Sequence, residues 1–366
     1  MKEDKMKNDE KFSGNSTKRK NKLNILIKTN RKVAILLDSV KGFLIALLLI
    51  TLIVFFASAI IHNILRVVEA SNEYKGKYKK LYTAGDGMMN LYTVGDGERI
   101  MIILPSLGDS SPVMKYKALA DSLSTNFKVV IAEPLGYGYS LSTKDPRTSK
   151  NIVNELREAL ENAKISGPYT LLAFSNSSIY ANYYSEQYPS EINGIITVDA
   201  IYPESLKSEK FKDRYLPNLI TNIKFYSMIS FSGLFRWQSY ISPDKFNIDK
   251  MQENSSYGEE DIKLYRNRIA NKWLTKEMRN EINKIQDNMK ELEDFKFNES
   301  LPTLQIITTD YRDEYLEREE NISRYATNLM TNKQIQRIRT IEGNLDNYLF
   351  TKEGIRDLKN LINMYF

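Results

Sequence analysis

A serine at residue 175 stands in a setting that suits nucleophilic chemistry. The segment LLAFSNSSIYANYY (171–184) joins an apolar run directly to a helical pattern through the letters AFSNS. Such a turn holds its central serine at a strained backbone angle, so the residues two positions to either side must be small, as Ala173 and Ser177 are. We predict that Ser175 is a nucleophile at the carboxyl end of a strand and that the amide of Asn176 faces a developing oxyanion.

Two loops precede this segment, and each follows an apolar run. They read LPSLGDSSP (104–112) and EPLGYGYS (133–140). With the serine turn, in this order and spacing, they make residues 82–366 resemble the α/β-hydrolase superfamily, especially its proline-iminopeptidase-like and esterase-like members. The resemblance implies an α/β fold in which a mostly parallel sheet has helices on both faces and a helical cap insertion.

The resemblance also implies roles for particular residues. It makes Ser175 the serine of a nucleophile elbow. Leu107 stands where the family has the last residue of a His-Gly-x segment, so its amide would be the second oxyanion donor. Asp310 ends LPTLQIITTD (301–310), where the family carries its catalytic acid. An aspartate after a strand can also simply form a turn, and that alternative stays open.

The catalytic histidine is where the chain departs from the family. The family places it after the last strand, and here Asn347, within EGNLDNYLFTKEGI (342–355), falls at or next to that position. The only histidine of the chain, His62, lies at the edge of a long apolar segment. Asparagine accepts no proton near neutral pH, and a positioned general base is worth about 10² to 10⁴-fold in rate. The pattern therefore indicates a protein with little or no hydrolase activity.

Two functions of different classes follow. The first is a pseudoenzyme that binds a ligand or partner in the old pocket beneath the cap. The second is an active serine hydrolase of small esters, amides or peptides that uses Ser175 with a base other than histidine, for example Lys352. A purely structural membrane protein is a third alternative.

Composition excludes several further classes. The chain has no cysteine, which rules out a thiol nucleophile, a disulfide framework and a cysteine-based zinc site. No metal-ligand cluster or phosphate-binding loop is present in the sequence, so we expect no metal and no cofactor. Residues 1–41 carry 12 lysines and arginines against 5 aspartates and glutamates, whereas the other residues carry 40 against 41. Because the basic charge belongs to the amino-terminal tail, we expect no nucleic acid as a partner.

The 24 residues from 42 to 65 carry no aspartate, glutamate, lysine or arginine. As a helix they would cross a hydrocarbon layer of about 30 Å. A buried core helix or a cleaved signal peptide would explain them less well, because the segment is apolar on every side and too long. We predict a signal anchor, with residues 1–41 as a disordered cytoplasmic tail under the positive-inside rule and the main domain outside the cell membrane.

Beyond a linker at 66–80, the domain at 81–366 alternates apolar runs with helical patterns. Buried strands are predicted at 100–104, 127–131, 169–173, 195–198, 304–307 and 335–341, and helices at 114–123, 151–163 and 179–188, with Thr148 or Ser149 as the cap of the second helix. Continuous apolar strands separated by helices predict a mostly parallel sheet. The insertion at about 203–298 has helical patterns only.

The domain has two smaller sequence features. The echo LYTAGDG and LYTVGDG (81–87 and 91–97) predicts two strands of an opening meander, with positive φ at the glycines that follow aspartate. In the insertion, Phe225, Phe231, Phe235 and Trp237 either pack within the cap, line an apolar ligand site or rest against lipid. Their burial decides among these alternatives.

Overall fold

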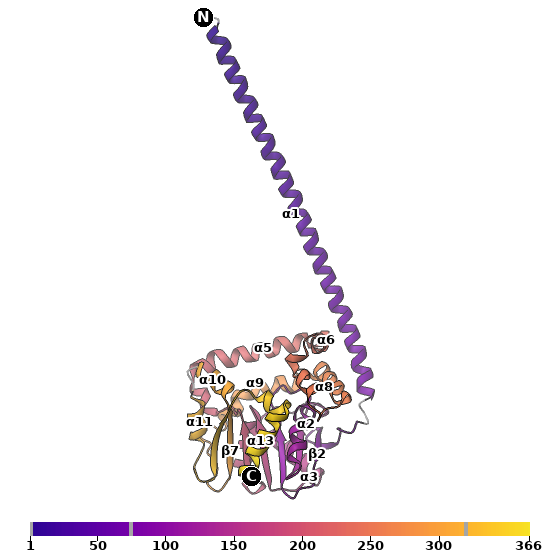
Figure 1. Cartoon of the computed structure of the whole chain (residues 1–366), viewed down its shortest axis with the longest axis vertical. Coiled ribbons are helices and arrows are strands. Elements are labelled where there is room, and N and C mark those ends of the chain that lie inside the picture. The colour runs from indigo at the N-terminus through magenta and orange to yellow at the C-terminus, as the bar shows by residue number, and fades with distance from the viewer. Residues whose placement is uncertain (1–2, 73–75, 318–320) are drawn as a thin grey trace. The chain divides into compact units, whose positions relative to one another are not determined.

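The computed structural model describes residues 3–72, 76–317 and 321–366 and divides the chain into two compact units that meet between Ile60 and Ile61. One helix, α1 (Glu3–Asn72), forms the first unit and enters the second (Figure 1). Its segment Ser39–Glu69 is long and apolar enough to cross a membrane. The expected apolar helix is therefore present among the described residues. The residues before this segment, which we expect to be disordered, are helical in the structure, since α1 begins at Glu3. No proline interrupts the helix between residues 3 and 72.

In the described part of the second unit, eight strands form one sheet in the order β1-β2-β4-β3-β5-β6-β7-β8. The first two strands pair antiparallel, β2 pairs antiparallel with β4, and all other neighbours are parallel. The strands are β1 (Leu81–Ala84), β2 (Gly87–Val94), β3 (Ile100–Leu104), β4 (Lys128–Glu133), β5 (Tyr169–Phe174), β6 (Ile192–Val198), β7 (Thr303–Thr308) and β8 (Gln336–Ile341). The predicted strands and the mostly parallel sheet are confirmed.

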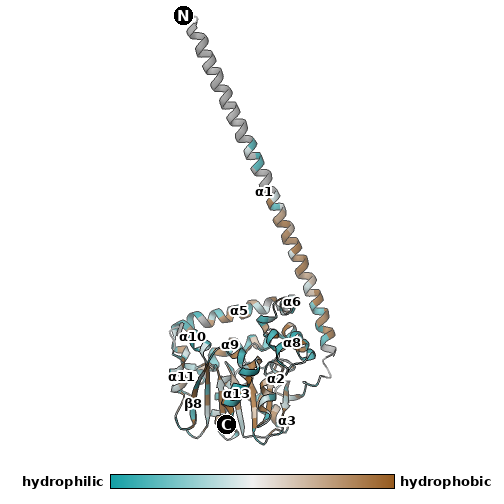
Figure 2. Ribbon diagram, viewed as in Figure 1, coloured by the Kyte–Doolittle hydropathy of each residue, from teal (hydrophilic) through white to brown (hydrophobic). Residues whose placement is uncertain are grey.

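Two apolar cores lie on the two faces of this sheet. Along β3, Ile102 and Leu104 belong to one core and Met101 and Ile103 to the other, because successive side chains of a strand point to opposite faces. Figure 2 shows the apolar strands between more hydrophilic helices. Both faces are thus buried, which explains why the strands read as continuous apolar runs.

Helices cover each face of the sheet. On the face of Ile102 lie α3 (Ser149–Asn162), α4 (Ser177–Gln187) and α11 (Ile322–Asn328). On the face of Met101 lie α2 (Pro112–Leu123), α12 (Leu345–Phe350) and α13 (Lys352–Tyr365). The hydroxyl of Thr148 accepts a hydrogen bond from the Asn151 amide and so caps α3, as predicted. The short helix η2 (Pro189–Glu191) precedes β6, and α10 (Thr309–Glu317) follows β7.

Helices alone fill the described insertion between β6 and β7. They are η3 (Pro203–Lys207), η4 (Lys210–Tyr215), α5 (Leu216–Ile229), η5 (Ser230–Ser232), α6 (Leu234–Ile241), η6 (Pro243–Phe246), α7 (Ile248–Glu253), α8 (Glu259–Lys272) and α9 (Lys276–Lys290). The insertion lies along one end of the sheet, with α5 and α9 across the strands (Figure 1). This arrangement is the helical cap that the sequence predicts.

The opening hairpin differs from its prediction in one respect. β1 and β2 pair so that Ala84 lies opposite Gly87, which leaves a two-residue loop between them. Positive φ occurs at Gly85 and Gly95, which precede the aspartates, and not at the glycines that follow them. Gly87 is already part of β2, where its φ must be extended. The second echo forms no hairpin, since β3 pairs with β4 and β5.

Candidate active site

Ser175 lies between the end of β5 and the start of α4, with a φ of +52°. Its amide donates to the Val198 carbonyl at 2.9 Å, which ties the turn to the end of β6. Ala173 and Ser177, the small residues two positions to either side, are buried. Left-handed φ is unfavourable for serine by about 1 to 3 kcal/mol, so the surrounding structure must hold this turn in place. The nucleophilic role of Ser175 stays a prediction.

The loop after β3 is joined to this turn by side-chain hydrogen bonds. The hydroxyl of Ser177 donates to the Leu104 carbonyl at 2.8 Å. The amide of Leu107 donates to Oδ1 of Asn176 at 2.5 Å. The amide that the resemblance assigns to an oxyanion therefore already has an acceptor, and that acceptor belongs to the residue directly after Ser175.

A buried carboxylate from the insertion continues this network. Glu281, on α9, accepts from Nδ2 of Asn176 at 3.0 Å, from the Tyr180 hydroxyl at 2.9 Å and from the Tyr137 hydroxyl at 2.8 Å. Burial raises the pKa of Glu281, while the hydrogen bonds and the positive charge of Arg147 oppose that shift. Sequence reasoning missed this residue, because a glutamate in a charge-rich helix gives no signal of burial.

The space beside this network is small. A cavity of about 30 Å³ is lined by residues that include Leu104, Pro105, Ser177, Tyr180 and Glu281. That volume holds about one water molecule. Ser175 does not line this cavity, and its side chain is partly exposed.

Two carboxylates lie at the ends of β6 and β7. Asp199, which sequence reasoning missed, is buried with a φ of +51° and accepts from the amide and the hydroxyl of Thr308 at 2.8 and 2.9 Å. Burial raises its pKa to about 6, and the carboxylates of Asp310 and Glu314 add to that shift. Asp310 itself is exposed in the first turn of α10. The position of Asp199 directly after the apolar run of β6 is the signal that could have found it.

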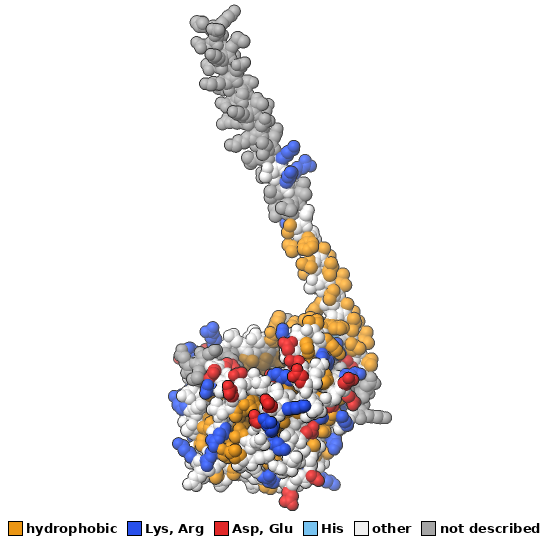
Figure 3. Space-filling model, in the orientation of Figure 1, with side chains coloured by type: hydrophobic (Ala, Val, Ile, Leu, Met, Phe, Trp, Pro, Cys, Tyr) orange, Lys and Arg blue, Asp and Glu red, His pale blue; other side chains and the backbone are white. Residues whose placement is uncertain are grey.

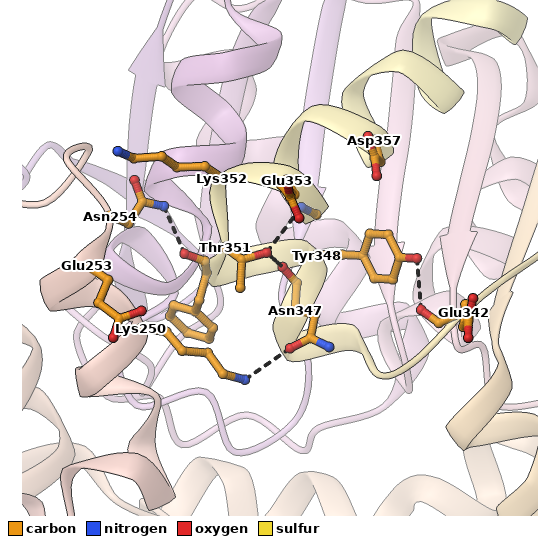
Figure 4. A pocket seen from close by; sticks show the side chains of 12 residues that line it. Lys250, Glu253, Asn254, Glu342, Asn347, Tyr348, Thr351, Lys352, Glu353 and Asp357 are labelled. Carbon is orange, nitrogen blue, oxygen red and sulfur yellow. Dashed lines mark hydrogen bonds between the residues drawn. The ribbon is translucent and has the colours of Figure 1, made fainter.

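Asn347 lies in α12 and lines a pocket of about 530 Å³ between α7 of the insertion and the last two helices. Its Oδ1 accepts from the ammonium of Lys250 on α7 at 3.2 Å. Figure 4 shows Lys250 reaching toward Asn347 across the pocket. Lys352, the alternative base, lines the same pocket. Ser175 is absent from its lining residues.

The structure brings the predicted catalytic residues to one edge of the sheet. The Asp310 amide donates to the Gly343 carbonyl at 3.1 Å, which joins the end of β7 to the loop that leads to Asn347. Among the described side chains, no hydrogen bond links Ser175, Asp310 and Asn347 to one another. The single histidine, His62 on α1, is buried, and its Nδ1 accepts from Nε of Arg236 at 3.3 Å. Within the residues searched, no group of three or more histidines and carboxylates is placed to hold a metal ion.

Comparisons with known proteins point to the same class of fold. A family model described as alpha/beta hydrolase fold matches residues 99–262. The uncharacterized protein YbdG of Bacillus subtilis is 31% identical over 146 residues, which are 38% of this chain and 45% of that protein. The chain thus spans less than half the length of this relative.

Solved structures of two different kinds of hydrolase resemble the chain. An epoxide hydrolase of Vigna radiata is 14% identical with a TM-score of 0.55, over 78% of this chain and 96% of that structure. A thermophilic esterase of Thermogutta terrifontis is 14% identical with a TM-score of 0.51, over 78% and 98%. At this level of identity, the similarity shows a shared fold and says nothing about activity. The family model and the shared architecture together show that this chain has the α/β-hydrolase fold.

Proposed function

We propose that this protein is a membrane-anchored α/β-hydrolase-fold protein that performs little or no acyl transfer and acts by binding a ligand or partner. The proposal rests on the observation that the only histidine of the sequence lies on α1 and is hydrogen-bonded to Arg236. A serine hydroxyl needs a positioned base to lose its proton, and no imidazole is left for Ser175.

The groups around Ser175 support the same conclusion. Oxyanion stabilisation requires donors that are free to point at the developing charge. The Leu107 amide instead donates to Asn176, whose own amide group is held by Glu281. At the position that the resemblance gives to histidine, the oxygen of Asn347 accepts from Lys250. An amide oxygen that faces an ammonium group cannot take up a proton.

A binding role has a place in the structure. The pocket at Asn347 is within the size range of small-molecule sites, which run from about 300 to 1,000 Å³. Its lining is polar and charged, with Lys250 and Lys352 beside four carboxylates. We propose that it takes a small polar ligand and that the chain binds no nucleic acid and needs no metal or cofactor.

The test of catalysis is reactivity toward a fluorophosphonate probe. We expect the full-length protein in detergent to be labelled no faster than its Ser175→Ala variant, because nothing assists proton removal. Ser178→Ala, a change of a neighbouring serine, is the control for nonspecific effects, and an active serine hydrolase is the positive control. Stoichiometric labelling that is lost only in Ser175→Ala would overturn the proposal.

One observation favours the alternative of an active serine hydrolase. The strained φ of +52° at Ser175 is the backbone state that a nucleophile elbow requires. In this second candidate function, Ser175 acts on small esters, amides or peptides with a base other than histidine. The same labelling experiment decides between the two, since selective labelling of Ser175 supports the hydrolase.

We further propose that the tail at 1–41 is cytoplasmic and that the main domain lies outside the cell membrane. Its 12 basic residues against 5 acidic ones favour the inner side. Protease added to intact protoplasts should therefore digest the main domain and leave a protected amino-terminal fragment. A main domain that stays intact until the membrane is permeabilised would contradict this orientation.

A further inference from the structure

The exposed side of the helix α6 is apolar. Its inner side, with Phe235, Arg236 and Ser239, is buried. Its outer side carries Trp237 and Ile241, which are 39% and 81% exposed. A helix with one face in water normally carries polar residues there. The outer side of α6 is therefore unusual for a surface in contact with water alone.

Exposed apolar residues continue from α6 into the end of α5 and the turn between them. We call this surface the apolar patch; it consists of Phe225, Phe231, Leu234, Trp237, Tyr240 and Ile241. Among the four aromatic residues that the sequence left open, only Phe235 packs inside the insertion, with its ring 4.8 Å from that of Trp273. Hydrophobic side chains gather at the edge of the main domain where α6 lies (Figure 3). Contiguous exposed patches of this kind mark interaction surfaces.

The last turns of α1 are bound directly to this part of the insertion. Both Nη atoms of Arg236 donate to the carboxylate of Glu69, at 2.6 and 2.9 Å. Nδ2 of Asn271, on α8, donates to the same carboxylate at 2.8 Å. Nδ2 of Asn63 donates to the Phe231 carbonyl at 3.5 Å, which joins α1 to the apolar patch itself.

The contact is close enough to exclude any side chain at Gly233. This residue precedes α6 as its N-cap with a φ of +76°, and a Cβ atom there would lie 2.6 Å from the Cβ of His62. Both facts require glycine. The close packing of His62 against Gly233 therefore fixes the distance between this part of α1 and the start of α6.

The contact between α1 and the insertion indicates what the apolar patch binds. Residues His62 to Glu69 are the last turns of the segment that can cross a membrane. If that segment spans the bilayer, its last turns end at the level of the lipid head groups, and whatever is bonded to them lies at the same level. Tryptophan and tyrosine concentrate at that level because their rings are amphipathic.

The residues beside the apolar patch are mostly basic, which favours binding to a lipid surface. The exposed ionisable side chains between residues 210 and 224 are Lys210, Lys212, Arg214 and Lys224 against the single acid Asp213. A basic stretch next to an apolar surface is attracted to anionic lipids.

We propose that the apolar patch is a membrane-binding surface, which enters the head-group region of the same bilayer that holds α1. The inference rests on the membrane anchoring in the proposed function and does not depend on whether Ser175 reacts.

The test uses the absence of cysteine, since a single introduced cysteine carries a single label. The full-length protein is reconstituted into vesicles of phosphatidylcholine and phosphatidylglycerol, with an environment-sensitive fluorophore at Ile241→Cys. Met364→Cys, 71% exposed on α13, is the matched control, and Ile53→Cys reports on the span. We expect lipids with a quencher near the head group to reduce emission at 241 by about twofold and to leave 364 unchanged. A deep acyl-chain quencher should reduce emission at 53.

The outcomes separate this inference from the anchoring on which it rests. Quenching at 53 without quenching at 241 would overturn the inference and leave the anchor in place. Absence of quenching at 53 would remove the anchor and the inference together. A shift at 241 that ignores the lipid quenchers but grows with protein density would mean that a second copy of this chain covers the patch, and it would also overturn the inference.

Discussion

Replacing Glu155 with alanine is expected to lower the free energy of unfolding by about 3 to 5 kcal/mol. Its partner, Arg147, is fully buried, and Nη1 of that arginine lies 2.7 and 2.8 Å from the two oxygens of the carboxylate. Burial raises the pKa of Glu155, and the charge of Arg147 opposes that shift. The cost of removing two charges from water offsets much of their attraction. The loss comes from leaving a guanidinium charge inside the protein without its counter-ion.

Urea unfolding of the full-length protein in detergent, followed by tryptophan fluorescence, measures this effect. Glu161→Ala, an exposed position on the same helix, is the matched control and should change the unfolding free energy by less than about 0.5 kcal/mol. The double variant Arg147→Met with Glu155→Leu should recover most of the loss, because it removes both charges. A loss of under about 1 kcal/mol in Glu155→Ala would contradict the assignment of a tightly buried pair.

The variant Asp199→Asn is expected to be more stable than the natural protein at pH 7 by about 2 to 3 kcal/mol. Burial raises the pKa of Asp199 from its usual 3.8 to about 6. Between these two values the folded protein holds more protons than the unfolded chain, so stability falls as the pH rises from about 4 to about 6. Asparagine can keep both contacts with Thr308, since its oxygen accepts from the amide and its nitrogen donates to the hydroxyl.

The measurement is the difference in unfolding free energy between Asp199→Asn and the natural protein at several pH values. We expect it to be near zero at pH 4 and to reach a plateau above pH 6, while other buried acids such as Glu133 and Glu281 cancel in the difference. Asp313→Asn, an exposed acid paired with Arg312, should give a flat line. A difference that is constant across this pH range would show that Asp199 has an ordinary pKa.

The sequence predicted the sheet well because the information is local. A strand buried on both faces must be apolar throughout, as β5 and β7 are, and a serine turn must have small flanking residues. Both rules can be read within ten residues or so. The bounds of the insertion could be predicted from the sequence for the same reason. The apolar strand patterns stop at its start and resume at its end.

The interior of the candidate site could not be read in this way. The contact of Leu107 with Asn176 joins residues that are 69 positions apart, and that of Asn176 with Glu281 joins residues 105 apart. No local pattern marks which polar side chain will meet another at such a separation. The end of α1 illustrates the same limit. In the sequence Glu69 is one charged residue of a linker, and only the structure places Arg236 beside it.

The hydrogen bonds of Glu281 also bear on how the cap can move. To swing away from the sheet as a lid, α9 would have to break the bonds to Asn176, Tyr137 and Tyr180 at once. Each such bond to a charged group is worth about 1.5 to 3 kcal/mol, so the sum approaches the stability of a whole domain. Opening of α9 and global unfolding thus become nearly the same event, and exchange of its amide hydrogens should be as slow as in the central strands.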